Sequence, residues 1–124
     1  MITGYVNAER EAIVRLRVRG SEPGQEHEIE AVVDTGFTGF LTLPPSLIAA
    51  LGLPWRGFGE AVLGDGSLHT FDVYRATVNW DGQERTIEVD AADTEPLVGM
   101  GLIYGHELRI AAVDGGPVTI GPLP

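Results

Sequence analysis

Length, composition and charge limit what this chain can be. It has 124 residues, 44% of them hydrophobic, which is enough for one domain with its own core. Eighteen acidic residues against eight basic ones give a formal net charge of −10. Such a surface repels phosphate backbones, so we expect no nucleic-acid partner. No apolar run is long enough to span a bilayer, so we expect no membrane partner.

Two further features bear on location and chemistry. Residues 1–13 lack a basic segment followed by an apolar one, so we expect no secretory signal and a cytoplasmic protein. Cysteine is absent, which excludes disulfides and thiolate catalysis and is compatible with a reducing compartment.

The first half of the chain predicts short strands and one helix. Residues 12–20 alternate apolar and arginine side chains, and residues 27–33 are the next apolar segment. With a turn at residues 21–25, they predict a β-hairpin. Residues 40–43 predict a third short strand. Residues 44–53, PPSLIAALGL, predict a helix with prolines at its start and a glycine at its end. Its buried stripe would consist of Leu47, Ile48 and Leu51.

The second half predicts further hairpins. Residues 57–80 form two apolar segments around a glycine-rich turn, and a second hairpin turns at Asp81-Gly82 and returns along residues 85–91. Residues 97–105 are apolar and interrupted by glycine, which predicts a short helical turn, and residues 109–120 predict a last hairpin. Many glycines and prolines between short apolar segments are typical of an all-β protein. No linker or repeat divides the chain, so we expect a single domain over residues 1–124.

The stretch from Ala31 to Pro44, AVVDTGFTGFLTLP, places a carboxylate at the end of an apolar strand. A charged group in such a place is costly unless something uses or compensates it. One interpretation is that Asp34 caps a turn by accepting backbone N–H hydrogen bonds. The other is that Asp34 is catalytic.

A resemblance to a known family favours the catalytic interpretation. Residues 32–44 resemble the active-site segment of aspartic proteases, whose motif is two apolar residues, Asp, Thr or Ser, and Gly. Residues 96–103, PLVGMGLI, resemble the second signature of that fold, which is two apolar residues, a glycine and the start of a short helix. The spacing between the two segments is similar to that in the single-lobed, retroviral-like (retropepsin-like) branch.

The resemblance implies a fold and an activity. The fold would be an all-β, single-lobed acid-protease barrel, closed, with one or two short helices. The activity would be that of an aspartic endopeptidase, a hydrolase that cleaves peptide or protein substrates without a metal or cofactor. Two close carboxylates share one proton because like charges a few ångströms apart cannot both ionise. The chain holds one Asp-Thr-Gly, so the resemblance implies a homodimer in which Asp34 lies beside Asp34 of the partner subunit.

The resemblance also implies roles for the residues around Asp34. Thr35 would hydrogen-bond across the twofold axis. Gly36 would allow a tight turn that leaves the carboxylate approachable. Gly99 would let the second apolar loop pack against the Asp34 loop. Phe37 stands where viral members have a small residue, and its bulk would narrow the site.

The family's flap is a mobile hairpin that closes over the substrate, and it would fall at the turn Gly64-Asp65-Gly66. Side chains beside this turn would then touch the substrate: Val62, Leu63 and Leu68. The alternative is an ordinary hairpin.

Other candidates have simpler interpretations. The histidines, at positions 27, 69 and 106, lack metal-ligand spacing, so we expect no metal site. We interpret Asp90, Asp93 and Glu95 as a solvated acidic loop before Pro96.

The chain ends bear on the dimer. The terminal strands of the family interleave between subunits, so deletion of residues 115–124 should weaken the dimer.

An alternative function from a different class is a dimeric peptide-binding or scaffold module with little turnover on the same fold.

Overall fold

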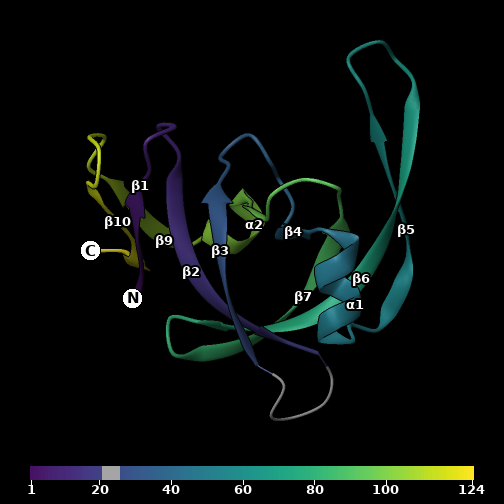
Figure 1. Ribbon diagram of the computed structural model, residues 1–124, viewed down its shortest axis with the longest axis horizontal. Coiled ribbons are helices and arrows are strands. Elements are labelled where there is room, and N and C mark those ends of the chain that lie inside the picture. The colour runs from purple at the N-terminus through teal and green to yellow at the C-terminus, as the bar shows by residue number, and fades with distance from the viewer. Residues whose placement is uncertain (21–25) are drawn as a thin grey trace.

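The structure is a computed structural model that describes residues 1–20 and 26–124. The turn expected at residues 21–25 lies outside the described residues. The chain is all-β, with 55% of its residues in strands and 9% in helices, and it contains a closed six-stranded barrel (Figure 1). The prediction of an all-β barrel with one or two short helices is therefore confirmed.

Ten strands and two helices lie within the described residues. The strands are β1 (Ile2–Val6), β2 (Ala12–Arg19), β3 (His27–Val33), β4 (Leu41–Leu43), β5 (Trp55–Val62), β6 (Leu68–Trp80), β7 (Gln83–Ala91), β8 (Leu97–Val98), β9 (His106–Ile110) and β10 (Pro117–Pro122). The helices are α1 (Pro45–Leu51) and α2 (Met100–Ile103). Neither described helix is long and apolar enough to cross a membrane.

One continuous sheet makes the barrel. Its strand order is β5-β6-β7-β4-β8-β3-β2-β1-β10-β9, and an additional antiparallel pairing of β6 with β2 closes the ring. This pairing joins Val18 to Val78 at its centre. The 13-residue β6 is long enough to pair with three strands. Its first half pairs with β5, and its second half pairs with β7 and β2.

The alternation predicted for β2 decides which face enters the barrel. Leu16 and Val18 are buried, whereas Arg17 points outward to Glu26 and Glu28 on the neighbouring chain segment. Burying each large apolar side chain stabilises the fold by about 1.5–3 kcal/mol. The exposed ion pairs add little, because solvent screens them.

The helix α1 forms as the sequence predicts. Pro44 is its N-cap, Pro45 is its first residue, and Ile48 and Leu51 are buried, whereas Leu47, the third residue of the expected stripe, is only partly buried against the core. Gly52 ends the helix with a φ of 62°, a left-handed conformation that glycine adopts at no steric cost.

The strand β8 lies between β3 and β4. It pairs in parallel with β3, where Val33 is opposite Val98, and antiparallel with β4, where Leu41 is opposite Val98. The chain therefore brings the segment after β3 and the segment after β8 to the same place. These are the two segments that carry the motifs described above.

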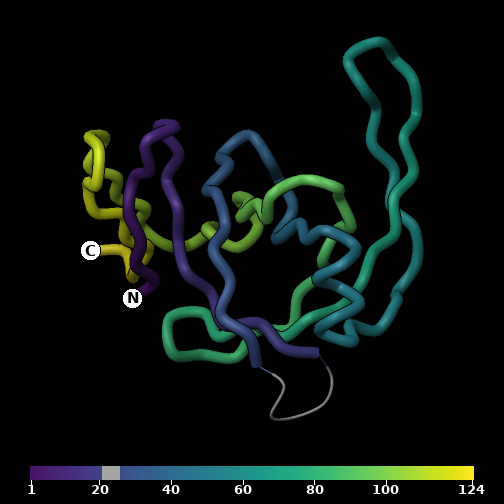
Figure 2. The backbone as a smooth tube through the Cα atoms, in the orientation of Figure 1, coloured from purple at the N-terminus to yellow at the C-terminus, as the bar shows by residue number. Residues whose placement is uncertain are grey.

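The two ends of the chain share one part of the sheet. β10 is hydrogen-bonded to β1 on one edge and to β9 on the other, and Val118 and Ile120 are fully buried. The expected contribution of β10 to a sheet shared between subunits does not fit this arrangement, because both of its edges are already paired within the chain. Figure 2 shows the two termini on the same side of the molecule.

The β5–β6 hairpin projects beyond the barrel (Figure 1). Residues 60–70 are all exposed. The loop after β3, the β1–β2 turn and the β9–β10 turn point to the same side of the molecule as this hairpin (Figure 1).

Candidate active site

Asp34 is the first residue after β3 and is half-buried. Its backbone N–H donates to the carbonyl oxygen of Val98 at 2.9 Å, which continues the β3–β8 pairing by one residue. The end of β3 therefore fixes the position of the carboxylate through the backbone.

The turn after Asp34 holds one of its carboxylate oxygens. Asp34 Oδ1 accepts a hydrogen bond from the backbone N–H of Gly36 at 2.9 Å, and the Asp34 carbonyl oxygen accepts from the Phe37 N–H at 3.2 Å. A Cβ at Gly36 would lie 3.3 Å from Oδ1, which is a tight contact. This is the geometry of the turn-capping interpretation, and it also fixes the orientation of the carboxylate.

Thr35 is exposed, and no hydrogen bond of its side chain occurs within the described part of the chain. It lines a cavity of about 500 Å³ whose walls come from β1, β2, β3 and the segment after β9. The bond expected from Thr35 would need a second chain.

Gly99 lies directly against the loop that follows Asp34. A Cβ at this position would be 2.2 Å from the Gly39 carbonyl oxygen and 2.8 Å from the Phe37 carbonyl oxygen. Hydrogen bonds tie the same two loops together, from Gly99 N to Phe40 O at 3.0 Å and from Met100 N to Phe37 O at 2.7 Å. The two motif segments therefore form one rigid unit.

The ring of Phe37 uses the space that two glycines leave open. A Cβ at Gly39 would be 2.5 Å from Phe37 Cζ, and a Cβ at Gly99 would be 2.5 Å from Phe37 Cδ2. The bulk at position 37 is thus accommodated against the loops, and Phe37 is half-buried there.

The hairpin tip has its own local order. Leu63 N donates to Ser67 O at 2.8 Å, and Gly66 N donates to Leu63 O at 2.9 Å, with a φ of 83° at Gly66. Asp65 Oδ1 accepts hydrogen bonds from the hydroxyl and the N–H of Ser67, and these bonds lower the pKa of Asp65. Gly64 lies between Leu63 and Asp65, and no atom outside these chain neighbours would lie within 4 Å of a Cβ at this position.

The apolar residues beside the tip are exposed. Val62 and Leu68 lie opposite each other across the two strands, with 70% and 65% of their surfaces accessible, and Leu63 is also exposed. The hydrogen bonds and ion pairs of the described residues include none between the tip and the Asp34 loop. The structure therefore brings Asp34, Gly36, Phe37 and Gly99 together and leaves the hairpin tip apart from them.

Asp90 lies within β7, as the strand predicted over residues 85–91 requires, and the interpretation of Asp90 as part of a solvated loop is wrong. Asp93 and Glu95 are exposed beyond the end of the strand. Partial burial, together with the negative charge of Glu88, raises the pKa of Asp90. Its Oδ2 would be 3.5 Å from a Cβ at Gly39, so the carboxylate faces the loop after Asp34.

Asp90 also lines a second cavity of about 500 Å³ between that loop and the base of the β5–β6 hairpin. The alternation in β7, where Ile87 and Val89 are buried, predicts that Asp90 points away from the barrel core. No local signal in the sequence indicates that another segment covers this outer face.

No group of three or more His, Asp or Glu side chains that could hold a metal ion occurs in residues 1–20 and 26–124. Compared with models of protein families and with curated proteins, the chain has no match in either set.

Proposed function

We propose that the chain is a retropepsin-like aspartic endopeptidase that acts as a homodimer, in which Asp34 of each subunit forms the catalytic pair. The observation that carries the proposal is the locked Asp34 turn. A half-buried carboxylate is held by the Gly36 N–H, and its loop is hydrogen-bonded to the Gly99 segment. Such a rigid setting suits a group that must meet a second carboxylate at short range.

The chemistry follows from two carboxylates that share one proton. The ionised member takes a proton from a water molecule held between them, and the oxygen of that water attacks the peptide carbonyl carbon. The protonated member gives its proton to the carbonyl oxygen. Collapse of the resulting diol breaks the C–N bond as the amine nitrogen receives a proton. No metal is needed, because both proton transfers use the pair.

The β5–β6 hairpin would close over a bound peptide. Its exposed apolar pair, Val62 and Leu68, supports this role, because a peptide would cover surface that the free chain leaves in water. A closed hairpin would also exclude bulk water from the carboxylate pair.

The test uses Asp34→Asn, with Asp93→Asn as the matched control, since Asp93 is an exposed acid outside the site. Cleavage of a peptide library is followed by mass spectrometry. We expect Asp34→Asn to reduce kcat/KM by at least about a thousandfold and the control to keep wild-type activity. Cleavage that persists in pure Asp34→Asn protein would contradict the proposal.

A binding measurement separates the alternative of a peptide-binding module. A peptide that carries a secondary alcohol in place of the scissile carbonyl mimics the tetrahedral intermediate, so the endopeptidase should bind it far more tightly than the parent peptide. A binding module would hold both peptides equally and cleave neither.

A further inference from the structure

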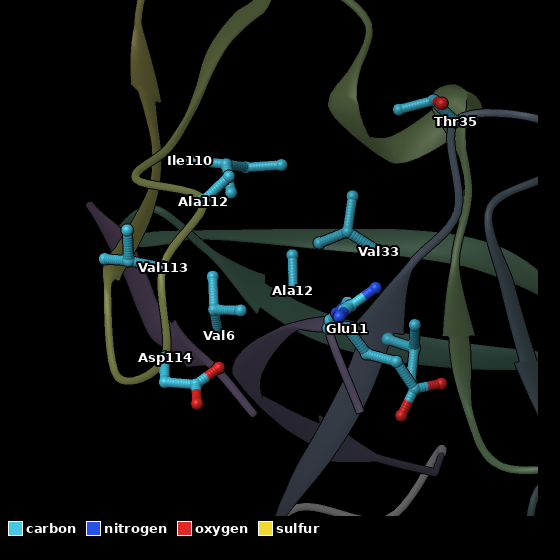
Figure 3. Close-up of a pocket in the computed structure, with 11 residues that line it drawn as sticks. Val6, Glu11, Ala12, Val33, Thr35, Ile110, Ala112, Val113 and Asp114 are labelled. Carbon is cyan, nitrogen blue, oxygen red and sulfur yellow. The ribbon is translucent and has the colours of Figure 1, made fainter. Parts of the chain in front are cut away.

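The cavity beside Thr35 has apolar walls that are open to solvent. Figure 3 shows Val6, Ala12, Val33 and Ile110 around the hollow. Val113, on the β9–β10 turn, also lines it and has 65% of its surface exposed. Apolar surface gathered in one concave place is typical of a site that another molecule covers.

The walls of this cavity are fixed by hydrogen bonds. Val6 N donates to Gly116 O, and Gly115 N donates to Val6 O, both at 2.9 Å, which joins the β9–β10 turn to β1. In the β1–β2 turn, Asn7 Oδ1 accepts from the N–H groups of Glu9 and Glu11. A preformed surface of this kind loses little entropy when a partner binds.

Two opposite charges on the cavity have no partner within the described chain. Arg10 and Asp114 both line the cavity and are exposed. The ion pairs between described residues include neither of them. The other charged lining residue, Glu11, is engaged by the side-chain amide of Asn7.

We infer that this cavity is the contact surface for a second copy of the chain, with Arg10 of one subunit paired to Asp114 of the other. The inference rests on the proposed function, which puts Asp34, and with it the adjacent Thr35, beside a twofold axis. A surface beside such an axis meets its own copy, so a contact between Arg10 of one subunit and Asp114 of the other would occur twice. Two copies that each carry a net charge of −10 repel one another, and contacts that join a cation to an anion offset that repulsion.

The proposed interface does not require a free edge of β10. Because β10 is hydrogen-bonded on both sides within its own chain, it offers no edge to a second subunit. The β1–β2 and β9–β10 turns join the subunits instead, through the apolar walls and the two charge pairs. The pair of Asp34 carboxylates would then depend on charge pairs formed by the β1–β2 and β9–β10 turns.

Charge reversal tests the inference on the full chain. Arg10→Asp and Asp114→Arg should each raise the dimer dissociation constant by at least about tenfold, measured by analytical ultracentrifugation. The double variant should return to within about threefold of wild type, because the pairs are restored in reverse. Position 10 has a φ of 64°, which Asp tolerates, so the change should not harm the turn.

The controls carry the same changes in net charge elsewhere. Arg75→Asp and Asp93→Arg alter exposed residues that do not line this cavity, and both should leave the dissociation constant unchanged. A second variant, Val113→Asp, should dissociate the dimer and keep the thermal stability of the subunit, since this side chain is exposed in the single chain.

The outcomes separate the interface from the function. If both charge reversals leave the dimer dissociation constant unchanged, the proposed interface is wrong. The endopeptidase proposal still stands in that case if Asp34→Asn abolishes cleavage. If each single variant weakens the dimer and the double variant restores it, while the wild-type chain cleaves no peptide, the interface is supported and the endopeptidase proposal is wrong. A wild-type chain that stays monomeric at all concentrations overturns the interface.

Discussion

Gly99 lies so close to Gly39 that a Cβ at position 99 would be 2.2 Å from the Gly39 carbonyl oxygen. Real Cβ atoms do not approach an oxygen so closely. The contact therefore joins the two motif segments through backbone alone, and any side chain at position 99 would force the Asp34 loop to move.

The first prediction follows from this contact. Gly99→Ala should destabilise the fold by about 1–3 kcal/mol, because the new methyl group overpacks a backbone contact that cannot yield. Gly64→Ala is the matched control, since nothing lies within 4 Å of a Cβ there. Urea unfolding measures both variants, and equal stabilities of the two would contradict the rigid unit described above.

The second prediction concerns Asp90. Because burial and Glu88 raise its pKa, the folded chain holds the proton more tightly than the unfolded chain does. The free energy of unfolding must then fall as pH rises from the unfolded pKa through the folded one. Asp90→Asn removes this loss, so we expect it to stabilise the chain at about pH 7 and to give no such gain at about pH 2.5.

Chemical denaturation at both pH values checks the Asp90 prediction. Asp93→Asn is the control, because Asp93 is exposed beyond the strand. The same gain at both pH values would show that the amide improves packing and that ionisation is not the cause.

The third prediction concerns the β5–β6 hairpin. Val62→Ser and Leu68→Ser should change the free energy of unfolding by less than about 0.5 kcal/mol, because both side chains are exposed. If the chain cleaves peptides as proposed, each variant should raise KM for these substrates about fivefold through lost apolar burial. Leu123→Ser, at a residue with 61% exposure near the chain end, is the control for both measurements. An unchanged KM in both hairpin variants would remove this hairpin from substrate binding.

The fourth prediction concerns the end of the chain. Deletion of residues 115–124 removes β10 from between β1 and β9, together with Val118 and Ile120 from the core. We expect loss of cooperative folding, seen as loss of the thermal transition by circular dichroism. Removal of residues 123–124 alone should leave the transition intact, because both are exposed. A folded monomer after the longer deletion would show that β10 is dispensable for the subunit.

Local features of the fold were predictable because they depend on few neighbours. The Asp81-Gly82 turn was read from its sequence, and the structure gives positive φ angles of 53° and 83° at these residues. The helix ended at Gly52 as predicted, and the short helix formed at Met100–Ile103. In each case, a residue with a strong local preference decides the backbone conformation.

Pairings between distant strands were not predictable. The sequence pattern does not predict β1, and neither the pairing of β1 with β10 nor the β2–β6 pairing that closes the barrel has a local signal. Strand partners are chosen by packing across the whole chain. The partial burial of Asp90 and the cavity lined by Arg10 and Asp114 were not predictable either, because both depend on the packing of segments far apart in sequence.

The pairing of Ile2 with Ile120 has a practical consequence for engineering. It brings both termini to one place beside β1 and β10, at the left of the view (Figures 1 and 2). A short glycine-rich linker is therefore enough to join the ends into a circular permutant, with new ends opened in an exposed turn. Such a rearranged chain would keep every strand neighbour while it reverses which segments emerge first from the ribosome.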